Sequence, residues 1–305
     1  MNSTRALIER LRAVFVTTVT PFDAGGAVDY GRLRACAEYL VDAGVGVLVP
    51  CGNTGEFSSL SLDEAARVTE VTVETVSGRA VVIAGVGWSL PMALELGRRA
   101  AASGADGVMA HHPVHTYIDR EGLRRYYEGL IEELEIGLVL YKRGPELTDE
   151  LIAELVQRDE VVGVKYAVND LNAFANLVAG SSAEVAWLCG TAERWAPFFY
   201  LAGAVGFSSG LANFAPRESL SLLDALQAGD WSRAMEIRAK LTPFEEIRQG
   251  RFNGNNVPAV KEAMRIAGLC EATVREPLLE LDPATARRVG EMVAAWDLEL
   301  SAVEP

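Results

Sequence analysis

Residue types that commonly build metal sites, crosslinks or membrane anchors are scarce in this sequence. The 305 residues include three histidines and four cysteines, and the cysteines lie far apart with no CxxC spacing. This pattern gives no support to a zinc knuckle or a disulfide framework, so we expect free, buried thiols. No apolar run approaches the length of a transmembrane helix, and the first twenty residues contain arginines but no continuous apolar core. We therefore expect a cytoplasmic protein with neither signal peptide nor membrane anchor.

Positive charge is also in short supply. The formal net charge is −14, whereas binding to a nucleic-acid backbone needs a clustered excess of Lys and Arg, so we expect no nucleic-acid partner. An acidic protein can still bind a small anion in a locally prepared pocket. Lysine is the rarer base: of 28 basic residues, only Lys142, Lys165, Lys240 and Lys261 are lysines. Where a positive charge alone is needed, this chain uses arginine.

Half of the residues are apolar, and some of them form eight short runs rich in Val, Leu and Ile. Runs that are apolar throughout are typical of parallel strands with both faces covered. Segments of helical periodicity separate them. This alternation predicts an α/β fold, a (β/α)8 TIM barrel; a doubly wound sheet is the alternative, because strand order cannot be read from one sequence. The runs span residues 13–20, 45–52, 80–87, 106–113, 136–143, 161–167, 185–191 and 204–210.

Helix starts and the division of the chain follow from the same pattern. Ser61 and Glu64 form a capping-box pattern, and Thr148 and Asn169 are candidate N-caps. About ninety residues of helical pattern follow the eighth strand. We expect a barrel over residues 1–215 and a C-terminal helical extension packed on it over residues 216–305.

The sixth run, VVGVKYA, ends in a lysine, Lys165. In a barrel of this kind the reacting groups sit at the carboxyl ends of the strands. A lysine there is partly desolvated, which favours the neutral amine and lowers its pKa. A neutral amine converts a ketone to an imine, whose protonated nitrogen draws electrons from the adjacent carbon and permits proton loss, retro-aldol cleavage or elimination. The structural alternative is a lysine that reaches out of the barrel to a carboxylate.

Imine formation also needs proton transfer, because the carbinolamine must lose water. Tyr141 ends the preceding strand and would lie beside Lys165 in the barrel wall, so its phenol is a candidate general acid and base. Tyrosine is also common in strands for packing reasons alone, which is the alternative interpretation.

The loop GNTGE, residues 52–56, follows the second run. Gly52 and Gly55 can let backbone N–H groups converge on an anion, and the side chains of Asn53 and Thr54 can add hydrogen bonds, which suits a carboxylate. The loop lacks the GK[ST] ending of a P-loop, and a glycine turn between strand and helix is also ordinary punctuation.

All three histidines lie in one short segment, HHPVH, as His111, His112 and His115. Three histidines within five residues could ligate a metal, which is the strongest rival chemistry. Pro113 interrupts the helical spacing of an HxxxH pair, and no carboxylate lies in this segment. Contacts to substrate hydroxyls and simple loop packing are the other interpretations, and we expect no metal.

Five motifs resemble, in order and spacing, those of the dihydrodipicolinate synthase and N-acetylneuraminate lyase superfamily: TPF, GNTGEFSSL, YKR, VVGVKYA and NNVPAVKEAM. The resemblance covers roughly residues 14–269. It implies a barrel with a helical extension, usually a homotetramer built as a dimer of dimers, that forms a Schiff base with pyruvate or a related 2-oxo acid. It also implies that Lys165 is the Schiff-base lysine, Tyr141 the proton-transfer tyrosine, and Thr54 the hydroxyl that links Tyr141 to bulk protons and helps to hold the carboxylate. No cofactor is implied beyond the covalent imine on Lys165.

Three positions depart from the synthase pattern. Asn53 stands where the synthase has a first threonine, and His115 where it has a tyrosine offered to the neighbouring subunit. The synthase arginine that holds the second substrate falls in a stretch that here reads GPELT. Arg143 instead stands two positions after Tyr141, which is similar to the sugar-acid dehydratases of the superfamily, such as those acting on 5-dehydro-4-deoxyglucarate.

We therefore expect a class I lyase that acts on a small 2-oxo acid, with a 2-keto-3-deoxy sugar acid favoured. The reaction would be dehydration, with or without decarboxylation, or pyruvate-dependent aldol cleavage. Arg143 is expected to bind a distal carboxylate, and Ser208, Ser209 and His115 to contact substrate. Three alternatives stay open: dihydrodipicolinate synthase proper, a metal-dependent barrel enzyme using the histidines, and a non-catalytic sugar-acid binding protein.

Overall fold

The computed structural model describes residues 3–296, in which eight parallel strands close into one barrel in the order β1 to β8, with β8 paired to β1. The predicted (β/α)8 fold is confirmed, and the doubly wound alternative is wrong because such a sheet leaves two edges open. The strands are β1 Val14–Thr17, β2 Val47–Val49, β3 Val81–Val86, β4 Gly107–Ala110, β5 Gly137–Lys142, β6 Val161–Tyr166, β7 Ala186–Cys189 and β8 Gly206–Ser209.

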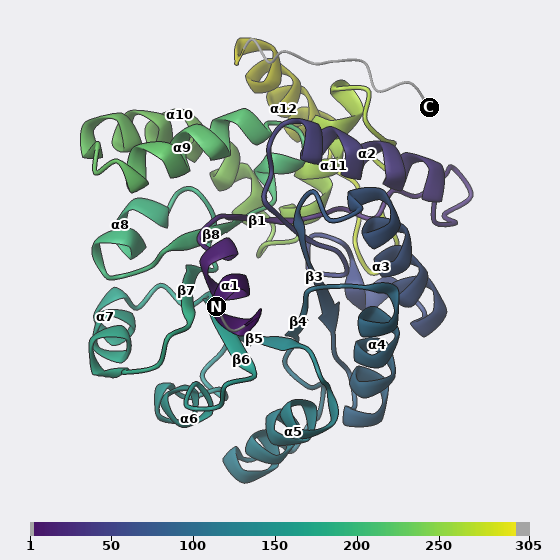
Figure 1. Cartoon of the computed structure of the whole chain (residues 1–305). Helices are drawn as coiled ribbons and strands as arrows, with labels where there is room; N and C mark the ends of the chain where they lie inside the picture. The colour runs from purple at the N-terminus through teal and green to yellow at the C-terminus, as the bar shows by residue number, and fades with distance from the viewer. Residues whose placement is uncertain (1–2, 297–305) are drawn as a thin grey trace.

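Helices alternate with the strands and surround them (Figure 1). Helix α1 is different, because it crosses the middle of the barrel in this view. Leu7 and Ile8 of α1 pack with Leu11 against the side chains of the barrel interior, so α1 closes the amino-terminal mouth. The helices up to β8 are α1 Ser3–Arg10, α2 Tyr30–Asp42, α3 Leu62–Val76, α4 Leu90–Ser103, α5 Arg120–Glu133, α6 Asp149–Leu155, α7 Leu171–Gly180 and α8 Ala196–Leu201, with a short 3-10 helix η1 at Phe57–Ser59.

Each strand buries both of its faces, which explains why the strand sequences do not alternate between apolar and polar residues. On β5 and β6, Val139, Tyr141 and Val162 belong to the cluster inside the barrel. Val164 and Tyr166 belong to the larger cluster between strands and helices. Lys165, between them, therefore faces the interior.

Within residues 3–296, four α-helices follow β8. Helix α9 follows that strand after one short 3-10 turn and contacts β1, so it completes the alternation as the last barrel helix. Helices α10 to α12 lie beyond the barrel, whereas the predicted boundary at residue 216 also counted α9 as part of the extension. Residues 297–305 of the predicted extension lie outside the described residues. Their bounds are α9 Pro216–Gln227, α10 Trp231–Gln249, α11 Asn256–Ile266 and α12 Pro283–Ala295, with a 3-10 helix η2 at Leu211–Asn213 before α9.

A buried ion pair ties this extension to the barrel. Lys261 Nζ of α11 lies 2.6 Å from Glu56 Oε1, and both side chains are fully buried. Glu56 also accepts a hydrogen bond from the backbone N–H of Arg275, whose guanidinium pairs with Glu64. Removing one partner of such a pair leaves an uncompensated buried charge and costs about 3–5 kcal/mol. We call Glu56 and Lys261 the clamp.

Two of the three predicted capping signals hold. Ser61 and Glu64 make the complete capping box of α3, and Thr148 caps α6. Asn169 does not cap α7, because the adjacent Asp170 accepts the hydrogen bond from that helix.

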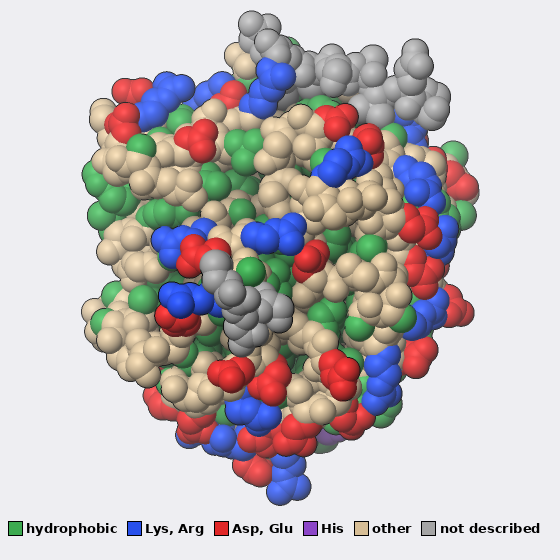
Figure 2. Space-filling view, viewed as in Figure 1, with side chains coloured by type: hydrophobic (Ala, Val, Ile, Leu, Met, Phe, Trp, Pro, Cys, Tyr) green, Lys and Arg blue, Asp and Glu red, His purple; other side chains and the backbone are tan. Residues whose placement is uncertain are grey.

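Charged side chains of both signs are interspersed on the face seen in Figure 2, densely so along its right and lower edges. Ion pairs between neighbouring helices account for part of this pattern, for example Arg34 with Glu74 and Arg98 with Glu133. Exposed pairs of this kind contribute little to stability, about 0–1 kcal/mol each. Within residues 3–296, none of the helices combines the length and the apolar character needed to span a bilayer.

Candidate active site

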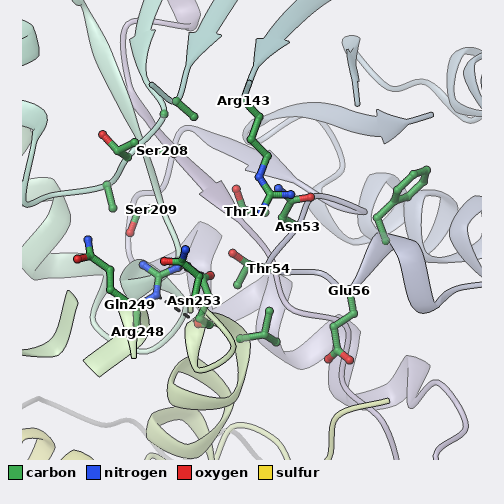
Figure 3. Close-up of a pocket in the computed structure, with 18 of the residues that line it drawn as sticks. Thr17, Asn53, Thr54, Glu56, Arg143, Ser208, Ser209, Arg248, Gln249 and Asn253 are labelled. Carbon is green, nitrogen blue, oxygen red and sulfur yellow. Dashed lines mark hydrogen bonds between the residues drawn. The ribbon is translucent and has the colours of Figure 1, made fainter. Parts of the chain in front are cut away.

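A cavity of about 490 Å³ lies at the carboxyl ends of the strands, where α10 and α11 approach the barrel. Its lining divides into two groups. The first, here called the barrel wall, consists of strand-end and loop residues that the sequence singled out: Asn53, Thr54, Tyr141, Arg143, Lys165, Ser208 and Ser209. The second, the helical wall, comes from α10, α11 and the loop between them: Glu245, Arg248, Gln249, Asn253 and Asn256. Figure 3 shows most of these side chains.

Lys165 reaches the cavity from β6 and is 5% exposed. It is paired in register with Tyr141 of β5, and its Nζ lies 4.6 Å from the centre of the Tyr141 ring. Burial, together with the charges of Arg143 and Arg248, lowers the pKa of Lys165 to about 8. No carboxylate within residues 3–296 forms an ion pair with it, so the alternative of an outward-reaching, paired lysine does not describe this residue.

Tyr141 is held beside that amine by a hydrogen bond from the Asn53 side-chain amide to its hydroxyl oxygen, 2.9 Å long. Burial raises the pKa of Tyr141, an effect that Arg143 and the Asn53 contact oppose. The phenol therefore keeps its proton at neutral pH and can donate it. Thr54 is buried and lines the same cavity.

Gly52 and Gly55 shape the loop without lining the cavity. A Cβ at Gly52 would lie 2.3 Å from the Thr17 side chain, and one at Gly55 would lie 2.7 Å from the Thr18 carbonyl oxygen. The Gly55 N–H donates to the Gly52 carbonyl oxygen within the turn. Close packing against Thr17 and Thr18 thus requires glycine at both positions. We expected the Gly55 N–H to bind an anion, but it is already hydrogen-bonded within the turn.

Arg143 follows β5 directly and extends toward the cavity from the side opposite Arg248 (Figure 3). It has no ion-pair partner among the described residues, unlike Arg248. Ser208 and Ser209 line the cavity from β8. The Ser209 hydroxyl accepts a hydrogen bond from the Ala212 N–H and lies 3.4 Å from the Ser219 hydroxyl.

The three histidines do not converge. His111 is buried, contacts the Cys51 carbonyl oxygen through Nε2 at 2.9 Å and stacks on Phe57. Burial lowers its pKa to about 4, which keeps the imidazole neutral. His115 is exposed, accepts the Tyr117 N–H and does not line the cavity of its own chain. In the described part of the chain, no three His, Cys, Asp or Glu side chains are grouped as a metal would need.

Sequence reasoning missed the helical wall. Arg248 lies in a segment whose pattern predicted only a helix, and Gln249 and Asn253 belong to no motif. Only Asn256 had a signal, since it falls within NNVPAVKEAM. A helical pattern alone gave no reason to expect that polar side chains of α10 would reach the carboxyl ends of the strands.

A buried lysine whose pKa is lowered to about 8, with a protonated tyrosine beside it at the strand ends of a closed barrel, defines a lyase of the aldolase type. A model of the Dihydrodipicolinate synthetase family matches residues 10–295. The chain therefore belongs to this family, as the motifs indicated.

Individual relatives agree with this assignment. The 4-hydroxy-tetrahydrodipicolinate synthase of Methanospirillum hungatei JF-1 is 35% identical over 292 residues, covering 93% of this chain and 99% of that protein. The enzyme of the same name from Pelobacter propionicus is 34% identical over 289 residues, with 93% and 98% covered. Dihydrodipicolinate synthases from Bacillus clausii and Oceanobacillus iheyensis superpose with TM-scores of 0.93 and 0.94, at 40% and 41% identity, over 96% of this chain and 100% and 99% of theirs.

Proposed function

We propose that Lys165 forms a covalent imine with the ketone of pyruvate or another small 2-oxo acid. The observation that carries this proposal is the buried Lys165 amine beside Tyr141, with its pKa lowered to about 8. Near neutral pH a useful fraction of such an amine is uncharged and nucleophilic.

The geometry supports a defined sequence of steps. Lys165 Nζ attacks the ketone carbon, and Tyr141 gives a proton to the carbinolamine hydroxyl, which leaves as water. The protonated imine then accepts the electron pair of a broken C–H or C–C bond at the neighbouring carbon and becomes an enamine. The enamine then takes up a proton or a carbon electrophile at that carbon and becomes a protonated imine again. Water finally hydrolyses this imine and returns the free lysine, so no external electron acceptor is needed.

The 2-oxo acid also has to be held by its carboxylate. Asn53 and Thr54 lie after the end of β2 on the barrel wall and offer an amide and a hydroxyl. Because the Asn53 amide also contacts Tyr141, this residue would couple carboxylate binding to the position of the phenol. Asn53 is thus hydrogen-bonded to Tyr141, and the role that the resemblance gave to Thr54, linking Tyr141 to bulk protons, stays a prediction.

Two reactions share this imine, and different observations favour each. The names of the curated relatives favour 4-hydroxy-tetrahydrodipicolinate synthase. For this reaction we propose that the enamine attacks an aldehyde carbon and forms a carbon–carbon bond, while the aldehyde oxygen takes up a proton. The position of Arg143 and the replacement of threonine by Asn53 favour a 2-keto-3-deoxy sugar acid that loses water. In the dehydration, the enamine expels the hydroxyl group on the next carbon, which leaves with a proton as water.

Proton exchange tests the imine with pyruvate alone, whichever full substrate the enzyme uses. Pyruvate incubated with the protein in D2O should lose its methyl proton NMR signal, because the enamine takes up deuterium at that carbon. Lys165→Ala should abolish the exchange. Exchange that persists in Lys165→Ala would contradict the proposal.

Product analysis then separates the two reactions. Pyruvate with the amino aldehyde that completes the dihydrodipicolinate ring, and 2-keto-3-deoxy sugar acids alone, would be assayed side by side by mass spectrometry. Ring product supports the synthase; loss of water, with or without carbon dioxide, supports the dehydratase. Arg143→Ala should impair diacid substrates more than monoacids if Arg143 holds a distal carboxylate, and equal, unchanged turnover of both would end that assignment.

The assembly that the resemblance implies is a homotetramer, a dimer of dimers. Val114 and Tyr117 flank His115 in an exposed segment and are 81% and 88% exposed, so this segment is a candidate subunit contact. Light scattering coupled to size-exclusion chromatography would give the mass directly. A monomer mass would contradict the expected assembly and leave the imine proposal standing.

A further inference from the structure

We infer that the helical wall is a subsite for a hydroxylated carbon chain, with Arg248 as the residue that determines specificity for it. The inference rests on the imine proposed above, which fixes one end of the substrate at Lys165. It concerns the opposite side of the cavity and residues that no motif identified.

Arg248 is held in place at almost every donor. Its Nη1 lies 2.8 and 3.1 Å from the two carboxylate oxygens of Glu245, its Nη2 donates to the Asn256 side chain at 2.9 Å, and its Nε donates to the Asn256 carbonyl oxygen. Nη2 carries two N–H groups and makes one of these contacts, so one N–H has no partner within residues 3–296. Arg248 is 4% exposed and lines the cavity, which places an unused donor at the cavity wall.

The end of β8 is built to admit this guanidinium. A Cβ on Gly210 would lie 2.5 Å from Arg248 Nη2, so a side chain at this position would displace the group. In Figure 3 the guanidinium lies between Ser209 and Thr54, toward the residues that hold the 2-oxo acid. A purely structural ion pair between Arg248 and Glu245 would not need to reach this position.

Acidic ion-pair partners determine which of the two arginines, Arg248 or Arg143, can bind an anionic group of a ligand. Glu245 offsets the charge of Arg248, and the neighbouring Glu193 is fully buried, with its pKa raised to about 7 by burial and by the charge of Glu245. A carboxylate would therefore gain little at the helical wall. Arg143, with no acidic partner in the described chain, is the better site for an anion.

The remaining groups of the helical wall suit hydroxyls. Gln249, Asn253 and Asn256 are amides that line the cavity. Gln249 Oε1 accepts from Arg194 and Asn256 Oδ1 from Arg248, so these two present chiefly their N–H groups, whereas Asn253 offers a donor and an acceptor, as a hydroxyl group requires. Asn253 is positioned by a strained backbone, because Arg251, Phe252 and Asn253 all have positive φ angles, 54°, 55° and 67°. Conformations of this kind cost about 1–3 kcal/mol each and persist where the surrounding structure enforces them, often at functional sites.

The experiment compares two ligands of equal chain length, 2-keto-3-deoxy-D-gluconate and 2-oxohexanoate, and includes the galactonate epimer of the first. Each is trapped on Lys165 by borohydride, which delivers hydride to the imine carbon to give a stable secondary amine. Intact mass identifies the adduct, and the concentration for half-maximal trapping reports binding. The preference ratio is the concentration for half-maximal trapping of 2-oxohexanoate divided by that of the sugar acid. Because the two chains have equal length, this ratio measures the contribution of the hydroxyl groups to binding.

The variants remove the donor without leaving a buried charge. Arg248→Gln combined with Glu245→Gln keeps the net charge of the wall unchanged, and Asn253→Gly removes a second contact while tolerating the positive φ. Lys240→Ala, on the exposed face of the same helix, is the matched control. We expect the wild type to prefer a sugar acid, and the double variant to lose about tenfold or more of that preference, since unpaired polar groups discriminate at this level.

Each outcome has one meaning. A wild type without preference for either sugar acid over 2-oxohexanoate, or a double variant that retains the full ratio, overturns the hydroxyl subsite. So does a variant that weakens all ligands equally, because that shows a structural role. If the wild type traps no 2-oxo acid, including pyruvate, the imine proposal itself fails, and that result is distinct from the others.

Discussion

The barrel wall and the helical wall of the cavity differ in what their residues do and in how the sequence encodes them. On the barrel wall, Lys165 and Tyr141 are neighbours in register, so the strand pairing alone brings amine and phenol together. On the helical wall, Arg248 depends on Glu245, Asn256 and the missing side chain of Gly210. If both proposals hold, the comparison teaches that the barrel sets the chemistry, whereas the added helices recognise the rest of the substrate.

The largest effect is expected from removing the proposed nucleophile, which tests whether the barrel wall carries the chemistry. Lys165→Ala should lower turnover by about 10⁴-fold or more, because the covalent route is lost. Its thermal midpoint should not fall, since burial disfavours the charged amine that is removed. Steady-state kinetics and thermal denaturation, with Lys240→Ala as control, check both parts. Retained turnover would show that the barrel wall does not carry the chemistry.

The clamp joins the loop after β2 to helix α11, so removing one of its charges should weaken the contact between the barrel and the helical extension. Lys261→Met leaves Glu56 buried without its partner and should cost about 3–5 kcal/mol of unfolding free energy. Combining it with Glu56→Gln should recover most of the loss. Chemical denaturation of the single and double variants measures this, and an additive effect of the two changes would mean that the ion pair is not the link.

Proton transfer provides the next test of the barrel wall. Tyr141→Phe should reduce turnover by about 10²- to 10⁴-fold while the imine with pyruvate still forms, more slowly. The packing of the ring on Lys165 is kept, so the fold should be unaffected. Rapid-quench trapping and steady-state rates distinguish the two effects. A variant with wild-type rates would assign the proton to another group.

The smallest expected effect is a shift in pH dependence. The amine must be uncharged to react, so the trapping rate should rise as pH passes through about 8. Arg143 lowers the pKa of Lys165, and Arg143→Gln should therefore move this rise to higher pH. Arg125→Gln, on the exposed surface of α5, should not. A shift to lower pH in Arg143→Gln would contradict the electrostatic account.

The sequence was most informative where local chemistry and position agree. Eight largely apolar runs that alternate with helical segments predicted the parallel strands of a barrel, because strands covered on both faces show no polar alternation. Closure itself was not encoded in this pattern, which also allowed a doubly wound sheet. The lysine at the end of one run, with a tyrosine ending the run before it, predicted a reactive pair that the register then placed side by side. The scarcity of lysine was a weaker guide, because Lys142 and Lys261 are also buried, and both serve in ion pairs.

What the sequence could not show depends on contacts between distant segments. The partner of Tyr141 is Asn53, 88 positions away, and Arg248 enters the cavity only because Gly210 has no side chain. Neither contact leaves a periodic pattern or a motif in the sequence. The histidine segment also shows this limit: proximity in sequence left a shared ligand open as an alternative, but burial of His111 and exposure of His115 place them in different environments.

The central claim, that Lys165 is the nucleophile, is tested most directly by trapping with pyruvate and borohydride followed by peptide mass spectrometry. The account predicts one pyruvate-derived secondary amine per chain, on the peptide that contains Lys165 and on none that contains Lys142, Lys240 or Lys261. Absence of the adduct under conditions that fully label a known Schiff-base aldolase, or an adduct on another lysine, would contradict it.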